Sequence, residues 1–149
     1  MEQTIGRMLY LAHRAVHDEL DRRLHEHGAS LWNWLLLDKA ANADDASQRE
    51  LAELMRIEAP TLVRHLDKLE EQGLVERRRD ERDRRVIRVV PTVVGRARFE
   101  EFHAVVTRAD LELRAALGEA GAEALGDALA RVESYYADAG APVRPGGTP

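Results

Sequence analysis

The chain has 149 residues, of which 44% are apolar and 33% are charged, and its formal net charge is −5 with no cysteine. This length and composition favour one folded domain with a real core over a disordered chain. Without cysteine, disulfides, thiolate metal sites and a thiol redox switch are excluded. No apolar run approaches the ~18 residues of a membrane span. The N-terminal segment carries charges too often for a signal peptide, so we expect a cytoplasmic protein.

Helical periodicity begins near the N-terminus. Apolar residues spaced three and four apart predict a long amphipathic helix over about 4–26, and Gly28 is placed to end it. A second apolar helix is expected in the segment SLWNWLLLDKAANA, where Ser30 can cap the first turn. The polar stretch NADDA then separates this helix from the next one.

Two shorter helices are expected next. Ser47 and Glu50 form the S-x-x-E pattern of a capping box at the start of SQRELAELM. Pro60 suits the first position of the following helix, where its missing N–H costs nothing. That helix is predicted to run to Gln72, with Gly73 ending it.

The pattern then changes from helix to strand. The runs LVERRR and RRVIRVV are β-prone and flank the polar DERD, which predicts a hairpin ending at Pro91. Thr92 can cap a long helix that has an apolar stripe. Gly118 and Gly121 are expected to interrupt this helix. A last helix is predicted in AEALGDALARVESYY. The Pro/Gly-rich tail, residues 139–149, is expected to be disordered.

Positive charge is concentrated in the hairpin. Residues 77–88 hold seven arginines against three acidic residues, so this segment carries +4 and the rest of the chain −9. A basic segment on an acidic protein is typical of a site for a polyanion. The alternative is a charged loop that is simply solvated.

Two short helices, a turn and a hairpin form a winged helix-turn-helix, whose second helix enters the major groove of DNA. The fold class expected is therefore mainly α with a two-stranded wing. On the second helix, leucines share one stripe and hydrogen-bond donors share an adjacent face. The donors are Thr61, Arg64, His65 and Lys68. Arg64, with His65 and Thr61, would read base edges, and arginine to guanine is the commonest such contact.

Charge suggests roles for the remaining basic residues. Lys68, Arg77 and Arg78 would contact phosphates, although Lys68 could also be simply solvated. The guanidinium groups of Arg84 and Arg85 suit the narrow minor groove. Asp83 would hold an arginine by a bidentate ion pair and so preform the wing; the alternative is an ordinary turn residue.

These segments resemble a known family. IEAPTLVRHLDKLEEQGLVER, DRRVIR and VVPTVVGRA are similar to the MarR family of winged helix-turn-helix regulators, and closely to its SlyA branch. The wing signature D-x-R-x-x-R stands here as Asp83, Arg85 and Arg88, and the P-T-L-V-R opening places the base-reading arginine at Arg64. The resemblance covers about residues 5–138. One departure is Pro91-Thr92, where the family commonly has Leu-Thr.

The resemblance implies a homodimer. Residues 4–28 and 92–138 would be dimerisation helices and residues 30–91 the DNA-binding lobe. Apolar stripes at both ends of the chain favour the same conclusion, because one small domain could not cover them. The alternative is a monomeric helical bundle. Two-fold symmetry predicts a palindromic DNA site with half-sites ~10 bp apart.

The resemblance also implies a small-molecule effector. In the family, phenolic or aromatic acids often bind between the dimerisation helices and the DNA-binding lobe, and Arg14 and Trp34 match positions that line this cavity. An arginine for a carboxylate and an indole for a ring are a sensible pair. The alternatives are a surface role for Arg14 and a core role for Trp34. Asp38 stands where the branch commonly has histidine.

Other functions are less well supported. His13 and His17, or His25 and His27, have spacings that could ligate zinc, but surface or capping roles fit better, so we expect no metal and no cofactor. The chain has no glycine-rich phosphate loop and no serine in a nucleophile motif, so we expect no enzyme. A winged helix that binds proteins remains the alternative. Salt-dependent binding to duplex DNA would distinguish a DNA-binding regulator from such a module.

Overall fold

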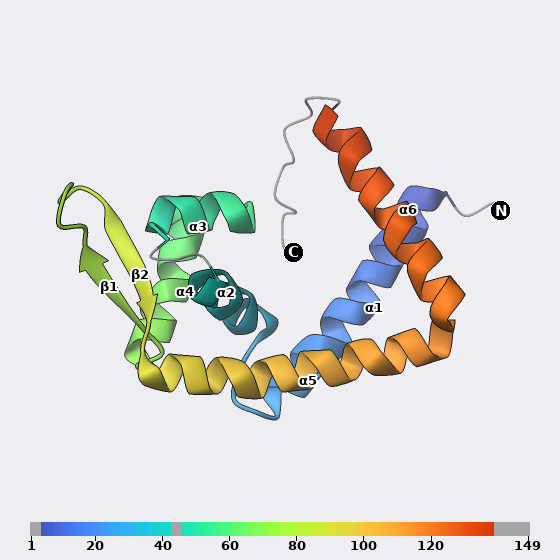
Figure 1. Cartoon of the computed structure of the whole chain (residues 1–149), viewed down its shortest axis with the longest axis horizontal. Coiled ribbons are helices and arrows are strands. Elements are labelled where there is room, and N and C mark those ends of the chain that lie inside the picture. The colour runs from blue at the N-terminus through green and yellow to red at the C-terminus, as the bar shows by residue number, and fades with distance from the viewer. Residues whose placement is uncertain (1–3, 43–45, 139–149) are drawn as a thin grey trace. The chain divides into compact units, whose positions relative to one another are not determined.

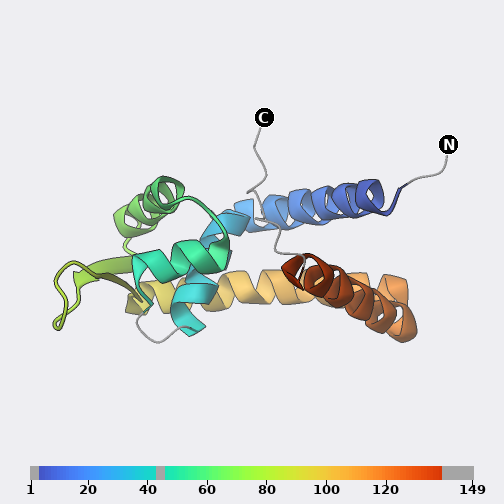
Figure 2. The same cartoon turned by 90° about the horizontal axis from the view of Figure 1, so that it is seen from above.

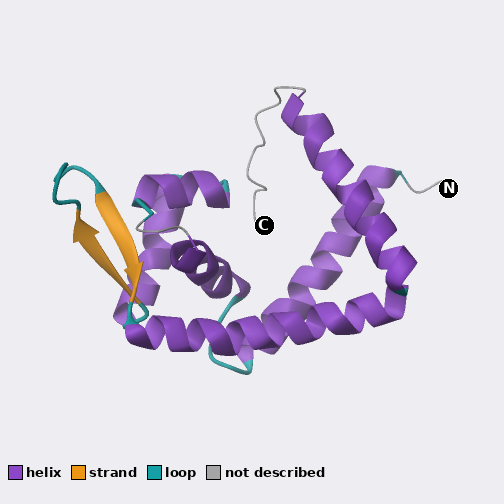
Figure 3. Ribbon diagram, viewed as in Figure 1, coloured by secondary structure: helices purple, strands orange, loops and turns teal. Residues whose placement is uncertain are grey.

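The computed structural model describes residues 4–42 and 46–138, so the tail predicted to be disordered lies outside the described residues. The described part contains eight elements (Figures 1 and 3). In chain order they are α1 (Ile5–His25), α2 (Leu31–Asn42), α3 (Gln48–Met55), α4 (Ala59–Glu71), β1 (Val75–Arg79), β2 (Ile87–Pro91), α5 (Val93–Leu117) and α6 (Glu119–Asp138). The mainly helical winged helix-turn-helix architecture is therefore confirmed.

The chain divides into two compact units, of which the first ends at Val106 and the second begins at Thr107. The first unit contains the helix-turn-helix, the hairpin and the first half of α5. The second contains the end of α5 and all of α6.

Side-chain caps begin three helices as the sequence predicts. Ser47 and Glu50 form the reciprocal capping box at the start of α3. The hydroxyl of Thr92 accepts a hydrogen bond of 2.9 Å from the N–H of Gly95 at the start of α5. The hydroxyl of Ser30 accepts one of 3.2 Å from the third residue of α2. These caps satisfy N–H groups that have no partner inside the helix.

Some predicted boundaries were wrong. Helix α4 begins at Ala59, so Pro60 is its second residue rather than its first. Gly118, with a φ of 70°, alone separates α5 from α6. Gly121 was expected to interrupt the helix but lies inside α6. One left-handed glycine is enough to end α5, and the next helix starts at the following residue.

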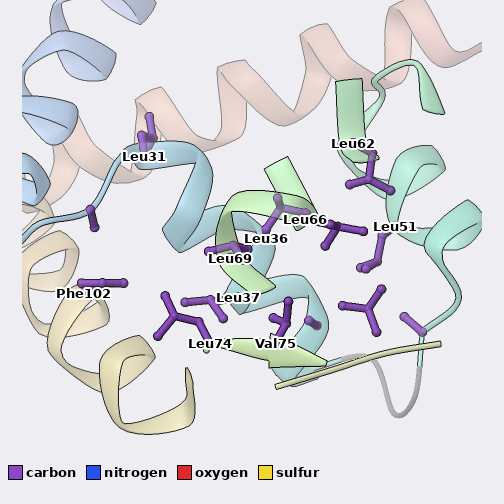
Figure 4. Close-up of a cluster of buried hydrophobic side chains, with 14 of the residues drawn as sticks. Leu31, Leu36, Leu37, Leu51, Leu62, Leu66, Leu69, Leu74, Val75 and Phe102 are labelled. Carbon is purple, nitrogen blue, oxygen red and sulfur yellow. The ribbon is translucent and has the colours of Figure 1, made fainter. Parts of the chain in front are cut away.

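The core of the first unit lies between α2, α3, α4 and the hairpin (Figure 4). Leu62, Leu66 and Leu69 of α4 are fully buried there, as their shared stripe predicts. Burying a leucine side chain contributes roughly 1.5–3 kcal/mol. Phe102 of α5 and Val89 of β2 belong to the same cluster. The inward face of α4 is thus fixed by packing, which leaves its opposite face available.

The hairpin pairs antiparallel, with Val75 opposite Pro91 and Arg79 opposite Ile87. Figures 1 and 2 show it projecting beside α3 and α4. The N–H of Val89 also donates to the carbonyl of Ala46 at 3.0 Å, just before α3. Strand β2 is therefore bonded along both edges, and the base of the hairpin is anchored to the helix-turn-helix.

A close backbone contact fixes the start of α5 within the first unit. A Cβ added at Gly95 would lie 1.8 Å from the carbonyl oxygen of Leu74. No side chain fits in that space, so the glycine lets α5 start directly against the turn that precedes β1.

Large apolar side chains remain exposed in both units. Those of α1 are Ile5, Met8, Tyr10, Leu11 and Val16, and those of the second unit are Leu111, Leu113, Leu117, Leu125, Leu129, Tyr135 and Tyr136. No side chain from Glu119 to Ala137 in α6 is buried. Such surfaces are normally covered by another chain or a ligand. None of the described helices is long and apolar enough to cross a bilayer.

Candidate nucleic-acid interface

The outward face of α4 presents basic groups that pair with no side chain in the part of the chain that the structure describes. Thr61, Arg64 and Lys68 are exposed. Within the described residues, Arg64 and Lys68 make no side-chain hydrogen bond or ion pair. Glu71 is also exposed and follows Lys68 by three residues, so one carboxylate shares the end of this face. The unpaired cations of α4 are available to an anionic ligand.

His65 behaves differently from its neighbours. Its ring stacks on Trp32 of α2, with ring centroids 5.1 Å apart and planes 21° apart. Burial, and to a lesser extent the charge of Lys68, lowers the pKa of His65 below its usual value. The sequence placed His65 among the base-reading donors without indicating Trp32, because the stack joins two helices far apart in sequence.

Arg77 is tied to α4. Glu70 accepts hydrogen bonds from the backbone N–H of Arg77 at 3.1 Å and from its Nε at 3.0 Å. Nη2 of Arg77 contacts Glu70 at 2.5 Å and Asp67 at 2.6 Å. Only 23% of the Arg77 side chain is exposed. The predicted phosphate role of Arg77 therefore competes with two carboxylates that already hold its guanidinium group.

Asp80 organises the loop between the strands. It accepts from the backbone N–H groups of Arg82 at 2.8 Å and Asp83 at 3.0 Å, and from Nε of Arg88 at 2.8 Å. The Asp83 N–H, the Arg88 side chain and the Arg82 N–H, in that order, lower the pKa of Asp80 to about 2. The carboxylate that holds Arg88 is thus Asp80, whereas the sequence pattern predicts Asp83 as the acid that structures the wing.

Asp83 instead holds Arg85, through one carboxylate oxygen rather than in the expected bidentate form. One oxygen, Oδ1, accepts from the backbone N–H of Arg85 at 3.0 Å and from its Nε at 3.2 Å. The Arg85 side chain is still 92% exposed. Both Arg84 and Arg85 lie in the loop, because β2 begins only at Ile87.

Arg88 links the wing to α3. Besides its bond to Asp80, its Nη1 lies 3.6 Å from the capping-box carboxylate of Glu50. The capping residue Ser47 faces Arg88 across an antiparallel bridge. Glu50 was found in the sequence only as a helix cap, so its contact with the wing is an additional role.

A hollow lies on one side of the hairpin. Its lining contains four arginines and three acidic residues: Arg78, Arg79, Asp80, Glu81, Arg82, Asp83, Val86, Arg88 and Val90. Arg78 pairs with Glu76 at 2.5 Å but keeps 65% of its side chain exposed. Exposed guanidinium groups at a loop held by Asp80 and Asp83 suit an extended anion such as a nucleic-acid backbone.

The two predicted effector residues have separate partners. Arg14 is exposed and lies 3.9 Å from Asp18 on the same helix. Trp34 is half-buried, and its ring is stacked against that of His103 of α5, with the ring centroids 6.5 Å apart. Its indole Nε1 is buried and has no hydrogen-bond partner among the described residues.

The histidine pairs whose spacings could ligate zinc form no metal site among the described residues. The rings of His13 and His17 are tilted, with centroids 5.9 Å apart. In residues 4–42 and 46–138, no three His, Asp or Glu side chains are grouped so that they could hold a metal ion.

Comparison with known proteins identifies the family. The MarR family model matches residues 30–87. The crystal structure of the transcriptional regulator PA3341 is 33% identical to the chain, with a TM-score of 0.79, and the match covers 91% of this chain and 99% of that one. The chain belongs to the MarR family. Members of this family are transcriptional regulators rather than enzymes, so the chain is a DNA-binding transcriptional regulator.

Two further MarR-type structures were determined with DNA. The transcriptional repressor CouR bound to a 23-mer DNA duplex is 27% identical with a TM-score of 0.83, and the match covers 87% of this chain and 92% of that one. A mutant of MarR from E. coli complexed with operator DNA is 25% identical to the chain, with a TM-score of 0.79. This match covers 86% of this chain and 92% of that one.

Proposed function

We propose that this MarR-family regulator binds palindromic duplex DNA as a homodimer, with α4 of each copy in a major groove and each hairpin over a neighbouring minor groove. The observation that carries this proposal is the outward face of α4, where Arg64 and Lys68 are exposed and unpaired within the described chain. Half-sites would lie ~10 bp apart, one turn of the duplex.

The exposure of each side chain and its ion pairs suggest which part of the DNA it would contact. Arg64 and Thr61 would contact base edges, and Lys68 and Arg78 would contact phosphates. His65, held against Trp32, would support this face rather than read a base itself. The loop residues Arg84 and Arg85 would enter the minor groove, where negative potential is strongest. Asp83 and Arg88 would keep the wing in shape for binding.

Exposed apolar side chains on α1, α5 and α6 support the proposed homodimer. Helix α6 has no buried side chain from Glu119 to Ala137, so within its own unit it has no core. A second copy that covers the exposed apolar residues of α1, α5 and α6 would remove this surface from water. We therefore propose 4–28 and 92–138 as the dimerisation segments and 30–91 as the DNA-binding lobe.

A small aromatic acid is the proposed effector, as in the SlyA-like branch that the sequence resembles. Arg14 would bind its carboxylate and Trp34 its ring. The buried, unpartnered Nε1 of Trp34 supports this, because an incoming oxygen could accept its hydrogen bond. Thermal shift with benzoate and salicylate tests the idea, and Arg14→Gln should abolish any stabilisation that they produce.

Selection of bound sequences from random duplexes tests the main proposal, together with light scattering of the complex. An enriched palindrome bound by two copies is expected. Binding that is absent even at low salt would favour the alternative, a winged helix that recognises proteins. Binding to one half-site by a single copy would reject the homodimer but leave DNA recognition intact.

A further inference from the structure

The contacts of Arg77 join the recognition helix to the wing. Glu70 lies in the last turn of α4, and Arg77 is the central residue of β1, opposite Val89. The carboxylate of Glu70 receives three bonds from Arg77, and Asp67 receives a fourth. Because the bonds involve both the backbone and the guanidinium group of Arg77, they constrain the position of the strand as well as that of its side chain.

The two carboxylates lie close to the proposed DNA-binding face. Asp67 follows Arg64 by three residues, so the two are neighbours on the surface of α4. Glu70 follows Asp67 by three residues, on the edge of α4 that contacts β1. Left unpaired, both carboxylates would repel a phosphate backbone approaching that face. The planar fork of one arginine satisfies both at once, which lysine cannot do with the same geometry.

We propose that Arg77 is a positioning residue for DNA binding, which clamps the wing to the recognition helix and neutralises Asp67 and Glu70 so that α4 can enter the groove. The proposal rests on the proposed function, since it concerns the same DNA-binding surface. It replaces the expectation that Arg77 contacts phosphate directly. A half-buried guanidinium held by two carboxylates has little left to offer DNA.

The adjacent residue provides an internal comparison. Arg78 points to the other face of β1, because side chains alternate along a strand. Among the residues that the structure describes, it pairs only with Glu76, and it is largely exposed. Arg78→Gln should therefore behave as the loss of a phosphate contact, which lowers the slope of log affinity against log salt by about 1. Arg77→Gln removes the same charge from the neighbouring position.

A double-mutant cycle tests the clamp. Binding of the full chain to its selected duplex is measured for Arg77→Gln, Glu70→Gln and the double variant at several salt concentrations. Arg77→Gln should weaken binding by roughly tenfold, and adding Glu70→Gln should recover the part of this loss that the unpaired Glu70 carboxylate causes. The double variant should keep the wild-type salt slope. Glu71→Gln removes an equal charge from α4 without touching Arg77, so it should change the affinity of the wild type and of Arg77→Gln by the same factor.

Several results would overturn the clamp. Failure of Glu70→Gln to restore binding, together with a slope lowered by about 1, would make Arg77 a phosphate contact. A coupling between Glu71→Gln and Arg77→Gln as large as that of Glu70→Gln would reduce the effect to overall charge. Arg77→Lys keeps the charge, so wild-type affinity in this variant would also reject the clamp. If Arg77→Gln does not fold, Arg77→Lys takes its place in the double-mutant cycle. If the wild type itself binds no duplex, the proposed function fails instead.

Discussion

Nε of Arg88 donates a 2.8 Å hydrogen bond to Asp80, whose other oxygen holds the N–H groups of Arg82 and Asp83. One carboxylate thus closes the loop and fastens it to β2. Because the loop carries Arg84 and Arg85, the geometry of Asp80 controls where these side chains are presented.

Asp80→Ala should loosen the loop without unfolding the protein. Backbone amides of residues 82–86 should exchange with solvent roughly tenfold faster, since the bonds that close the loop are lost. DNA affinity should fall as well. Asp80→Asn is the matched variant, because its amide oxygen can still accept the backbone N–H groups while the charge is absent. Hydrogen exchange that is unchanged in Asp80→Ala would contradict the role assigned to this residue.

The same carboxylate makes the loop sensitive to acid. The pKa of Asp80 falls from the ordinary 3.8 to about 2 in the folded chain. Its contribution to stability is therefore complete above the unfolded pKa and is lost as the pH falls through about 2. Amide protection in the loop should persist at pH 4 and disappear toward pH 2. In Asp80→Asn this transition should be absent.

The stack between Trp32 and His65 predicts a second pH effect. Burial lowers the pKa of His65 in the folded state, so the unfolded chain takes up a proton first as the pH falls below the ordinary 6.5. The folded state therefore keeps its full stability above that pH, and it loses stability on acidification because protonation favours the unfolded chain. His65→Phe, which can keep the stack, should lose less melting temperature between pH 7.5 and 5.5 than the wild type. Trp32→Ala should raise the pKa of His65, measured by NMR titration.

Arg64 and Lys68 should differ in what they contribute to DNA binding. Arg64→Ala should cost ~1–3 kcal/mol on the selected duplex and relax base preference. Lys68→Ala should weaken all sequences alike and lower the salt slope by about 1. Competition binding with selected and scrambled duplexes measures both effects. Discrimination that survives intact in Arg64→Ala would remove Arg64 from the base-reading role.

Gly95 should tolerate no side chain. Gly95→Ala places a methyl group against the carbonyl of Leu74, and overpacking of this kind costs about 1–3 kcal/mol or more. Denaturant unfolding should show the loss. Gly6→Ala is the control, because a Cβ at that helical position meets nothing within 4 Å. A stability loss of equal size in both variants would mean that the contact at Gly95 is not the cause.

Local signals predicted most of the fold. Ser47 with Glu50, and Thr92, mark helix starts because a cap needs only nearby residues. The leucine stripe of α4 predicted its buried face for the same reason. Gly118 and Gly121 could not be ranked from sequence, since either could have adopted the left-handed conformation that ended α5.

The partners of the site residues were harder to predict. Asp80 and Asp83 are three residues apart in one polar loop, and only the folded loop shows which of them meets Arg88. Strand alternation separates Arg77 from Arg78, but it does not say which face lies against α4. Sequence patterns describe faces of single elements, whereas these contacts depend on which elements pack together.

The hairpin also bears on how the protein avoids aggregation. Unpaired strand edges invite other chains to add to a sheet. Strand β2 pairs with β1 on one edge, and on the other edge its Val89 N–H donates to Ala46, so that edge is partly covered. On β1 the outward N–H of Arg77 is taken by Glu70, and the strand VERRR carries charge on four of its five residues. These two bonds and the charged side chains make the hairpin a poor template for a foreign strand.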